Sequence, residues 1–494
     1  MALAASEAST IHRDLSSLAF KRVLFAACPT GAYCREDRCQ SFFKFELIPS
    51  MRPPMEDCEA AGAVSALGAA HQVIDAPAER LSRAAFLKSA VLFSPDLIIL
   101  AVTFGSLEAD LAYARELKEL IPGALIGLRG APCYVQAESL LQENPQVAFC
   151  LNGDYEIAVG HCVERGINTA RGVIWRDKYG AIIKNNPAYA EDLDLLPLPD
   201  RSTIDHSLYT VRGLRSAQAT VHVQRGCPFP CSFCLVHTVS GNRARHRSPA
   251  SVADEIRSLM DQGLRYFYLR ADTFTLNKKW AIAISQALQQ RCPGARWVTA
   301  TRVECVDDAT IAAMRAGGCY GISFGVDVAS EEIGARVHKK PALAQAAEAM
   351  RLCDRYGVIS LAYLMIGFIW ESRSTLAETA AFARAIRPDL ITLHYAHPYP
   401  GTAYYQAVKE AGLAGQIAEK AQAEPAVDLP GLSAAELSAF GRKLLLQHYI
   451  RPSVVGSLVR KLAGLQIERR RSTLEATAGV ISPVGCSAPI DTSL

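Results

Sequence analysis

The side chains of this chain with the clearest chemical potential are three cysteines in Cys227-Pro-Phe-Pro-Cys231-Ser-Phe-Cys234. They follow the strand-like run 220–225, and their spacing, C-x3-C-x2-C, places three thiols on one tight loop. Three thiolates can hold three irons of a cubane iron-sulfur cluster and leave the fourth iron without a protein ligand, whereas an inert carrier supplies four cysteines. The spacing therefore predicts a [4Fe-4S] cluster with one iron open to chemistry.

Other interpretations of these cysteines stay open. Zinc needs four ligands and usually takes them from C-x2-C pairs, and here His222 or His237 could supply the fourth. Two further alternatives remain. Two of the cysteines could form a disulfide and leave one spare thiol, or all three could be purely structural. The N-terminus carries no apolar export signal, which disfavours the disulfide because thiols stay reduced in the cytoplasm.

The overall composition narrows the class of protein. A chain of 494 residues is expected to form two or three domains, each with its own core. Its net charge of +3 is small and indicates no nucleic-acid partner. No apolar run reaches the ~18 residues of a membrane span. The 15 cysteines are scattered along the chain and fit a reduced compartment, so a cytoplasmic location is expected.

The first third of the chain predicts a doubly wound sheet. Residues 1–20 are polar and are expected to form a flexible leader. From residue 21 to 165, short apolar strands alternate with longer helical stretches, which indicates a parallel α/β domain of the flavodoxin or Rossmann type. Ligands of such domains bind at the carboxyl ends of the strands. The segments expected there are rich in small and turn-forming residues, and they are 29–31, 103–106, 129–132 and 152–156.

The remainder of the chain predicts a second α/β unit. Residues 166–215 contain Gly and Pro breakers and are expected to form an extended linker. From 216 to 405, six strand-and-helix units follow one another, which predicts a partial (β/α)6 barrel of TIM type whose working face lies at the strands' carboxyl ends. Residues 406–475 have helical periodicity and are expected to form a small C-terminal helical region, and residues 476–494 a disordered tail.

The cysteine motif, with Phe233 directly before the third cysteine, resembles that of the radical S-adenosylmethionine superfamily. The strand ends of the first domain are similar to the cobalamin-binding domain of one branch of this superfamily. Gly130 and Pro132 match its Gly-Gly-Pro segment, and Gly153 and Glu156 match its Gly-Glu-x-Glu segment. The resemblance implies a [4Fe-4S] cluster, S-adenosylmethionine and cobalamin as cofactors, and a flavodoxin- or ferredoxin-type electron donor. The chain has no Asp-x-His-x-x-Gly, so no histidine ligand to cobalt is expected.

The resemblance also assigns roles to individual residues. The cluster ligands are Cys227, Cys231 and Cys234. The residues expected around S-adenosylmethionine are Phe233, Asp272, Arg302, Asp327, Ile366 and Gly367. Those expected around cobalamin are Thr30, Gly31, Thr103, Gly105, Ser106, Gly130, Pro132, Gly153 and Glu156. No residue is assigned to catalysis beyond these contacts.

Some of these assignments have a structural alternative. Asp272 could accept a charge-assisted hydrogen bond from the methionyl ammonium group, or it could cap the helix that follows. Arg302 could bind a carboxylate or pair within the barrel. Asp327 is shorter than the glutamate that relatives carry there, and Ile369 and Trp370 stand where relatives have Pro-Gly.

The resemblance finally implies a type of reaction. A 5'-deoxyadenosyl radical and methylcobalamin would together methylate an unactivated carbon, or a phosphinate phosphorus, of a small specialised metabolite. The same cofactors also serve radical cyclisation, rearrangement or oxidative ring formation, which is the alternative enzymatic function. An iron-sulfur or cobalamin carrier with a redox-sensing role is the non-enzymatic alternative.

Overall fold

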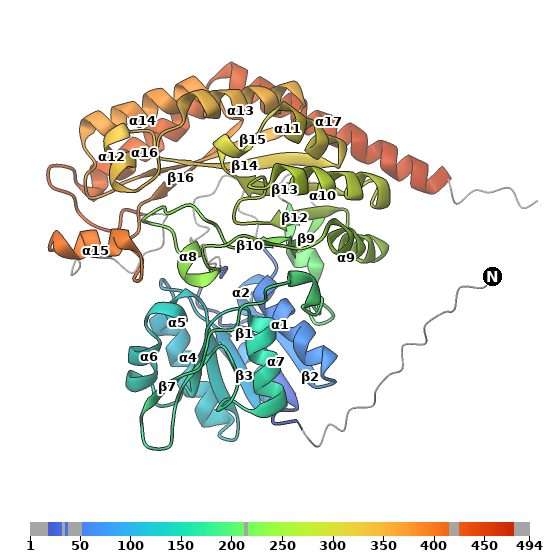
Figure 1. The fold of residues 1–494 in the computed structure, drawn as a ribbon, viewed down its shortest axis with the longest axis vertical. Coiled ribbons are helices and arrows are strands. Elements are labelled where there is room, and N and C mark those ends of the chain that lie inside the picture. The colour runs from blue at the N-terminus through green and yellow to red at the C-terminus, as the bar shows by residue number, and fades with distance from the viewer. Residues whose placement is uncertain (1–17, 32–34, 38–51, 212–215, 414–423, 479–494) are drawn as a thin grey trace, which may run out of the picture.

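Two α/β units, one above the other in Figure 1, make up the described chain. The computed structural model describes residues 18–31, 35–37, 52–211, 216–413 and 424–478. Most of the predicted leader (1–20) and of the predicted tail (476–494) lies outside these residues. Within them, no helix is both long and apolar enough to cross a membrane.

The first unit is built on a sheet of seven strands. They are β1 (Arg22–Ala27), β2 (Ala70–Asp75), β3 (Leu97–Ala101), β4 (Leu125–Arg129), β5 (Phe149–Leu151), β6 (Val173–Arg176) and β7 (Ile182–Lys184). Their order across the sheet is β2-β1-β3-β4-β5-β6-β7. The first five strands in this order are parallel, and the pairings of β5 with β6 and of β6 with β7 are antiparallel. Every residue of the central strand β3 is buried, as expected for an apolar strand that is covered on both faces.

Helices cover both faces of this sheet. They are α1 (Met55–Ala66), α2 (Ala76–Glu79), α3 (Arg83–Phe93), α4 (Leu107–Leu120), α5 (Ala131–Val135), α6 (Ala137–Glu143) and α7 (Tyr155–Arg165). On one face, Phe25 of β1 shares a core with Val159 of α7. On the other face, Leu100 of β3 shares a separate core with Phe86 of α3. Two cores on opposite faces confirm the doubly wound fold predicted from the sequence.

Two of the strands, β6 and β7, lie in the segment 166–215 that the sequence assigns to a linker. Leu151 of β5 pairs with Val173 of β6, and Trp175 of β6 pairs with Ile183 of β7. The sheet therefore continues past residue 165, because this hairpin completes the otherwise open edge of β5. Beyond it, the chain crosses to the second unit through the 3-10 turns η3 (Leu193–Leu195) and η4 (His206–Leu208).

The second unit is a curved half-barrel. Its main sheet contains β8 (Thr210–Val211), β9 (Ser216–His222), β12 (Tyr266–Arg270), β13 (Arg296–Thr301), β14 (Cys319–Asp327), β15 (Ile359–Ile366) and β16 (Leu390–Tyr395). The order is β16-β15-β14-β13-β12-β9-β8. The six longer strands are parallel, as the six predicted units require, and β8 closes the outer edge of β9 in the antiparallel sense.

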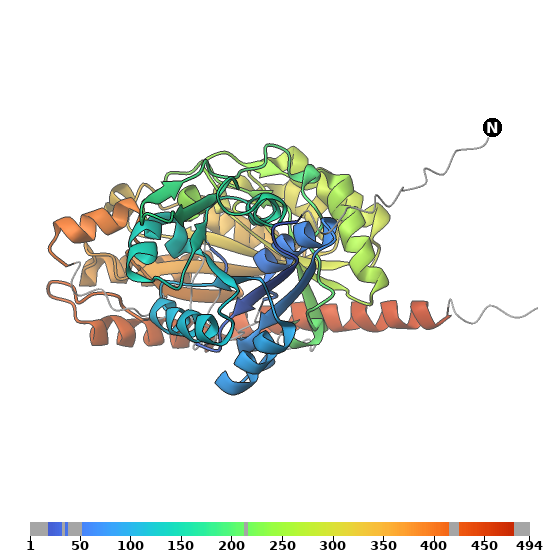
Figure 2. The same cartoon turned by 90° about the horizontal axis from the view of Figure 1, so that it is seen from below.

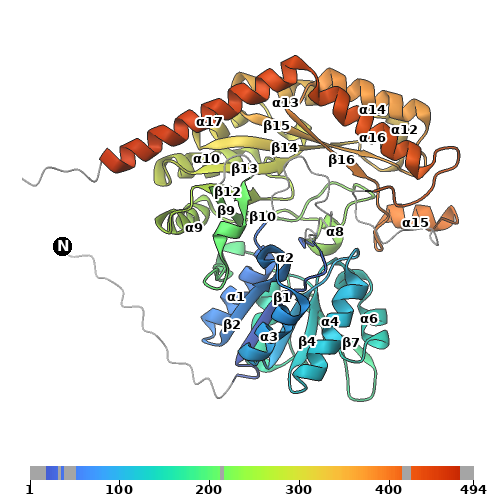
Figure 3. The same cartoon turned by 180° about the vertical axis from the view of Figure 1, so that it is seen from behind.

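Helices line the outer face of the half-barrel (Figure 3). They are α9 (Pro249–Asp261), α10 (Lys278–Arg291), α11 (Asp308–Ala316), α12 (Glu331–Arg336), α13 (Leu343–Arg355) and α14 (Arg373–Ile386), with the short turn η5 (Val303–Cys305) before α11. Four of these helices have an N-cap residue whose side chain accepts a hydrogen bond from a backbone N–H of the first turn. These residues are Ser248, Asn277, Asp307 and Ser372. The core between sheet and helices includes the fully buried Trp297.

The C-terminal region is helical, as predicted. α15 (Ala403–Glu410) follows the last barrel strand, and α16 (Ala434–Tyr449) begins with a capping box formed by Ser433 and Glu436. The last helix, α17 (Pro452–Ala478), runs past residue 475, where the helical region is expected to end. Residues 466–478 contain neither Gly nor Pro and are rich in Arg, Glu and Ala, so nothing in them stops the helix. Its far end projects beyond the half-barrel (Figures 1 and 3).

Candidate active site

The three cysteines lie on a loop that is closed at its base by a small antiparallel ladder. β10 (Gln224–Arg225) enters the loop and pairs with β11 (Arg245–His246), which leaves it, and α8 (Val236–Val239) lies between them. Gly226 starts the loop with a φ of +87°, and a Cβ there would overlap the Arg243 carbonyl oxygen. Only glycine fits this turn, so the backbone enters the cysteine segment along a fixed path.

Hydrogen bonds from three other segments hold this loop. Its Cys227 N–H donates to the Gly241 carbonyl at 3.2 Å. Ser232 is held at both ends, since its N–H donates to the Val337 carbonyl at 3.0 Å and its carbonyl accepts from the Tyr404 N–H at 2.9 Å. The loop between Cys227 and Cys234 is thus tied to the ends of α12 and α15 and does not depend on its own sequence alone.

The three thiols are half-buried, whereas the other cysteines in the described ranges are buried, and none of these cysteines forms a disulfide. Cys227 Sγ lies 3.5 Å from Thr273 Oγ1, Cys231 Sγ accepts from Arg302 Nη1 at 3.4 Å, and Cys234 Sγ accepts from the Val236 N–H at 3.5 Å. Burial raises the pKa of Cys231, and it raises the pKa of Cys234 to about 12. Metal coordination would replace these protons and provide the counter-charge that the buried thiolates need.

The donor set fits a cluster better than a single ion. His222, one candidate fourth zinc ligand, has its Nδ1 3.0 Å from Glu59 Oε1 of the first unit. Across the described residues, no three His, Cys, Asp or Glu side chains converge as the ligands of one metal ion would. A cubane cluster distributes three cysteine ligands over three irons, so its thiols need not converge on one point.

The segment predicted to cradle adenine lies against the cysteine loop. The ring of Phe233 is 5.8 Å from the ring of Phe368, the residue that follows Gly367. Gly367 has a φ of +84°, and its N–H donates to Glu371 Oε2 at 2.9 Å. Ile366 is fully buried in the same apolar cluster. The fold thus brings together three of the six residues predicted around S-adenosylmethionine: Phe233, Ile366 and Gly367.

Asp272 has a partner that excludes its alternative role as a helix cap. Its Oδ2 accepts a hydrogen bond of 2.6 Å from the Gly226 N–H, directly before the first cysteine. The following helix, α10, is capped instead by Asn277, whose side chain accepts from the Trp280 N–H. Asp272 therefore lies beside the cysteine loop with its carboxylate partly committed to the backbone.

Asp327 and Arg302 are engaged with neighbouring charges. Asp327 ends β14 with a φ of +59°, just after a register shift, and pairs with Lys339, whose Nζ also donates to the Gly325 carbonyl at 2.7 Å. Arg302 Nε donates to Glu304 Oε1 at 2.7 Å. Sequence reasoning missed both partners. Lys339 meets Asp327 across 12 positions and only through the fold, whereas Glu304 lies two positions after Arg302 but stands in no recognised motif.

Glu371, behind the Gly367 turn, gives a pH-dependent prediction. Burial raises the pKa of this carboxyl from its ordinary value of 4.5 to about 7. Because the folded value is the higher one, the carboxyl stabilises the fold fully below pH ~4.5, and this contribution is lost as the pH rises through ~7. Glu371→Gln keeps an acceptor for the Gly367 N–H but cannot titrate. Thermal unfolding should show wild type losing stability relative to this variant between pH ~5 and ~8, and parallel pH profiles would contradict it.

The predicted cobalamin segments meet at the switch point of the first sheet. The order β2-β1-β3 reverses direction between β1 and β3, where doubly wound folds bind ligands. Thr30 follows β1, and its Oγ1 donates to Asp110 Oδ1 at 2.7 Å. Ser106 follows β3, and its Oγ donates to Asp110 Oδ2 at 2.6 Å and lies 2.9 Å from Thr103 Oγ1. Asp110 of α4, which sequence reasoning missed, joins the two strand ends.

Arg35 completes this polar group. Its guanidinium donates to the Ala101 carbonyl at 2.6 Å and to Thr30 Oγ1 at 2.7 Å, and it pairs with Asp110 at 3.0 Å. The Arg35 side chain is only 8% exposed, so the charge is compensated inside the unit. Thr30, Thr103 and Ser106 therefore form one connected network with residues of two strand ends and a helix.

Two glycines shape the other strand ends. Gly130 has a φ of +129° and a ψ of 168°, and a Cβ there would overlap the Val102 carbonyl oxygen. Its N–H donates to Tyr155 Oη at 3.1 Å. Gly153 has a φ of +105°, and a Cβ there would overlap the Ala188 carbonyl oxygen. Both positions require glycine, because another backbone segment of the same unit packs directly against each of them.

Glu156, predicted at the cobalamin site, pairs with an arginine of the half-barrel. Its Oε1 lies 2.6 Å from Arg225 Nη2, beside the cysteine loop. Arg225 also pairs with Glu59 at 3.0 Å and with Asp154 at 2.8 Å. Burial raises the pKa of Glu156 to about 7, whereas the neighbouring arginines lower the pKa of Asp154 despite its burial.

Further ion pairs join the same two surfaces. Arg245 of β11 pairs with Asp154 at 2.6 Å, and Arg270 of β12 pairs with Glu56 at 2.6 Å and with Glu36 at 3.2 Å. We call the arginines Arg225, Arg245 and Arg270 with the carboxylates Glu36, Glu56, Glu59, Asp154 and Glu156 the interface clamp. All eight side chains are at least nine-tenths buried.

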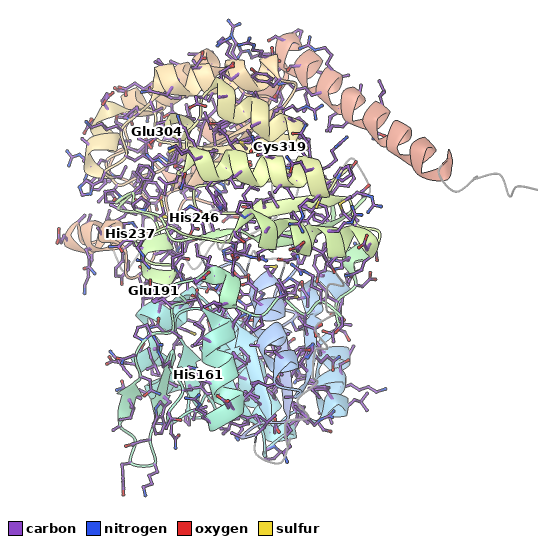
Figure 4. The ribbon with its side chains drawn as sticks, turned by 45° about the vertical axis from the view of Figure 1, so that its right-hand side comes forward. His161, Glu191, His237, His246, Glu304 and Cys319 are labelled. Atoms are coloured by element: carbon purple, nitrogen blue, oxygen red, sulfur yellow. The ribbon has the colours of Figure 1, made fainter. Side chains whose placement is uncertain are left out.

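An apolar contact accompanies the interface clamp. Phe104, from the segment after β3, stacks at 5.3 Å on Tyr399, which follows β16. Tyr399 shares a small core with Ala131 of α5 and with Leu235 and Val239 at α8. From below, the first unit lies across the front of the half-barrel (Figure 2), and Figure 4 places His237 of α8 and Glu191 of the linker where the units meet. The carboxyl ends of both sheets thus face each other.

Comparison with known proteins identifies the second unit. The family model described as the radical SAM superfamily matches residues 221–383. An uncharacterized methyltransferase of Pyrococcus horikoshii is 26% identical over 408 residues, covering 81% of this chain and 88% of that protein. The anaerobic magnesium-protoporphyrin IX monomethyl ester cyclase of Rubrivivax gelatinosus is 27% identical over 349 residues. This match covers 67% of the chain but only 62% of the cyclase.

A solved structure shares the whole two-unit arrangement. The radical S-adenosylmethionine methyltransferase TsrM from Kitasatospora setae, with cobalamin and a [4Fe-4S] cluster bound, superimposes with a TM-score of 0.61. The superposition covers 79% of this chain and 78% of TsrM at 16% identity. At that identity the likeness concerns the fold, and it extends over both the doubly wound unit and the half-barrel.

Proposed function

Because the chain belongs to the radical S-adenosylmethionine superfamily and is an enzyme, we propose that it is a cobalamin-dependent methyltransferase for a small specialised metabolite. One observation carries the proposal: the three-cysteine loop faces the glycine-lined strand ends of a doubly wound unit across a buried interface. A methylating centre needs a radical source and a methyl carrier next to each other, and this interface juxtaposes a candidate site for each.

In this proposal, Cys227, Cys231 and Cys234 hold a [4Fe-4S] cluster, and Phe233 with Gly367 receives adenine. Asp272, which accepts from the Gly226 N–H beside the first cysteine, offers the methionyl ammonium a charge-assisted hydrogen bond. When bound, the cluster and S-adenosylmethionine supply a 5'-deoxyadenosyl radical and cobalamin supplies a methyl group. The chain itself orients these groups and excludes water from the radical.

Cobalamin would lie against the backbone at Gly31, Gly105, Gly130, Pro132 and Gly153, with Thr30, Thr103 and Ser106 at the switch point. The positive φ of Gly31, Gly130 and Gly153 allows sharp turns at these strand ends, where doubly wound folds bind their ligands, and this supports the placement. Glu156 would then act through Arg225 and not by touching the corrin.

The substrate class follows from the chemistry available. A carbon-centred radical removes hydrogen from carbons that acids and bases cannot activate, so an unactivated carbon, or a phosphinate phosphorus, is the proposed methyl acceptor. The name of the Pyrococcus relative, a methyltransferase, supports methyl transfer. We further propose a flavodoxin- or ferredoxin-type electron donor and a reduced cytoplasmic setting, which the free thiols support.

Reconstitution of the full chain tests the two cofactor sites separately. Anaerobic loading with iron, sulfide and hydroxocobalamin should give about four irons and about one cobalamin per chain, read by elemental analysis and absorption spectra. Gly130→Ala should lower cobalamin uptake at least tenfold and leave the iron content unchanged, because its φ and ψ are essentially restricted to glycine. Gly123→Ala, with no atom near its added Cβ, is the matched control. Wild type that takes up the cluster but excludes cobalamin would refute the methyltransferase.

A radical cyclase is the second candidate, favoured by the likeness to the Rubrivivax cyclase. The products released from S-adenosylmethionine distinguish a methyltransferase from a cyclase. Release of 5'-deoxyadenosine together with S-adenosylhomocysteine indicates methyl transfer, whereas 5'-deoxyadenosine alone indicates cyclisation or rearrangement.

A further inference from the structure

Arg302 occupies an unusual place for a residue expected to bind a substrate-side carboxylate. It follows β13 at the carboxyl end of the strand, and its Nη1 donates to the sulfur of Cys231 at 3.4 Å. Its guanidinium also lies over the ring of Phe229, 3.9 Å from the ring centroid, inside the Cys227-Pro-Phe-Pro-Cys231 segment. The positive charge is therefore in contact with the cysteine loop itself.

Glu304 fixes the orientation of this guanidinium. Its Oε1 accepts from Arg302 Nε at 2.7 Å and also pairs with Nη2, so one carboxylate oxygen contacts two of the three guanidinium nitrogens. The Arg302 side chain is 12% exposed, which limits screening by water. Figure 4 shows Glu304 on the half-barrel side of the molecule. The Nη1 that remains free of Glu304 is the atom that reaches Cys231.

A donor aimed at a cluster ligand has a definite electrostatic effect. Reduction adds one electron to an iron-sulfur cluster, and this charge spreads onto the ligand sulfurs. Hydrogen bonds to these sulfurs, and net positive charge near them, favour the reduced form and raise the reduction potential. A nearby carboxylate has the opposite effect, and Glu304 holds its carboxylate against Arg302.

We propose that Arg302 and Glu304 act as positioning residues that set the reduction potential of the cluster through Cys231. Arg302 raises the potential by donating to the sulfur, and Glu304 moderates its charge and aims its Nη1. The inference rests on the proposed function only in requiring a cluster on the three cysteines. Lys339 and Asp327 are the other charges close to Cys231, and they neutralise each other by pairing.

The test is a redox titration of the reconstituted full chain without S-adenosylmethionine, with an electrode and mediators as the electron source and electron paramagnetic resonance as the readout. Arg302→Gln should lower the ratio of reduced to oxidised cluster at a fixed potential about tenfold, which is about 59 mV for one electron. Arg302→Lys should fall between this variant and wild type. Glu304→Gln should shift the potential in the opposite direction. Arg351→Gln, in an exposed pair with Glu348, should leave it unchanged.

The outcomes are distinguishable. If Arg302→Gln weakens S-adenosylmethionine binding but leaves the potential unchanged, Arg302 serves the carboxylate of that ligand and the inference is overturned. Shifts of the same sign in the Arg302→Gln and Glu304→Gln variants would overturn it as well, because loss of structure and not charge would explain them. Wild type that assembles no cluster would refute the proposed function instead.

Discussion

Replacing Cys227 by Ala should remove the iron-sulfur cluster and with it all cleavage of S-adenosylmethionine. With two thiolates left, one iron loses its only protein ligand, and the cluster no longer has three anchors. The iron content should fall from about four per chain to below one, and the absorbance of the cluster should disappear. Release of 5'-deoxyadenosine under dithionite should fall at least a thousandfold, to the background of the assay.

Cys353→Ala is the matched control for that result. Cys353 is a fully buried thiol of α13 in the half-barrel core, far in sequence from the cysteine loop. Its loss should cost about 1 kcal/mol of stability but no iron. Full activity in the Cys227→Ala protein would show that the loop holds no catalytic cluster, and loss of iron in the Cys353→Ala protein would show that the assay reports stability.

Replacing Arg225 by Leu should destabilise the fold by about 3–5 kcal/mol, the usual cost of stranding a buried charge. The substitution leaves Glu59, Asp154 and Glu156 facing one another without their shared cation. Because the stranded carboxylates can escape the penalty by taking up protons, the difference from wild type should shrink as the pH falls from ~8 to ~5.5. Urea unfolding of the full chain at both pH values measures it.

An exposed ion pair provides the comparison. Arg351→Leu removes the partner of Glu348 on α13, where both side chains are more than half exposed, and it should cost less than about 1 kcal/mol at either pH. If Arg225→Leu is no more costly than this control, the interface clamp does not contribute to stability. A cost that does not change with pH would mean that lost packing, and not stranded charge, is responsible.

The sequence predicts the half-barrel more fully than the first sheet. Between consecutive strands of the six parallel barrel strands lies a helix of at least 9 residues, so periodicity alone locates them. In the first sheet, β2 is the run Ala-His-Gln-Val-Ile-Asp, with its first three residues accessible at an edge, and β5 has only three residues. An accessible edge strand such as β2 and a very short strand such as β5 carry too little apolar pattern to be predicted. β6 becomes a strand only through pairing with β5, and β7 through pairing with β6.

The candidate site likewise contains residues that the sequence predicts and partners that only the structure reveals. The cysteines and the glycines are predictable because spacing or a positive φ ties them to local backbone. The partners of these residues are not, since Arg225 meets Glu59 across 166 positions of sequence and Asp110 meets Thr30 across 80. Glu156 shows the limit most clearly. Its motif marks the right strand end, but only the fold reveals that its carboxylate faces an arginine of the other unit.

The interface clamp also has a consequence for how this chain can be recombined. Its three arginines all come from the half-barrel and its five carboxylates all come from the first unit, so neither surface is neutral without the other. A first unit transplanted from a relative would have to bring acidic residues at matching positions. Otherwise it would bury three uncompensated cations beside the cysteine loop. The two units therefore have to be exchanged together if the buried charges are to stay paired.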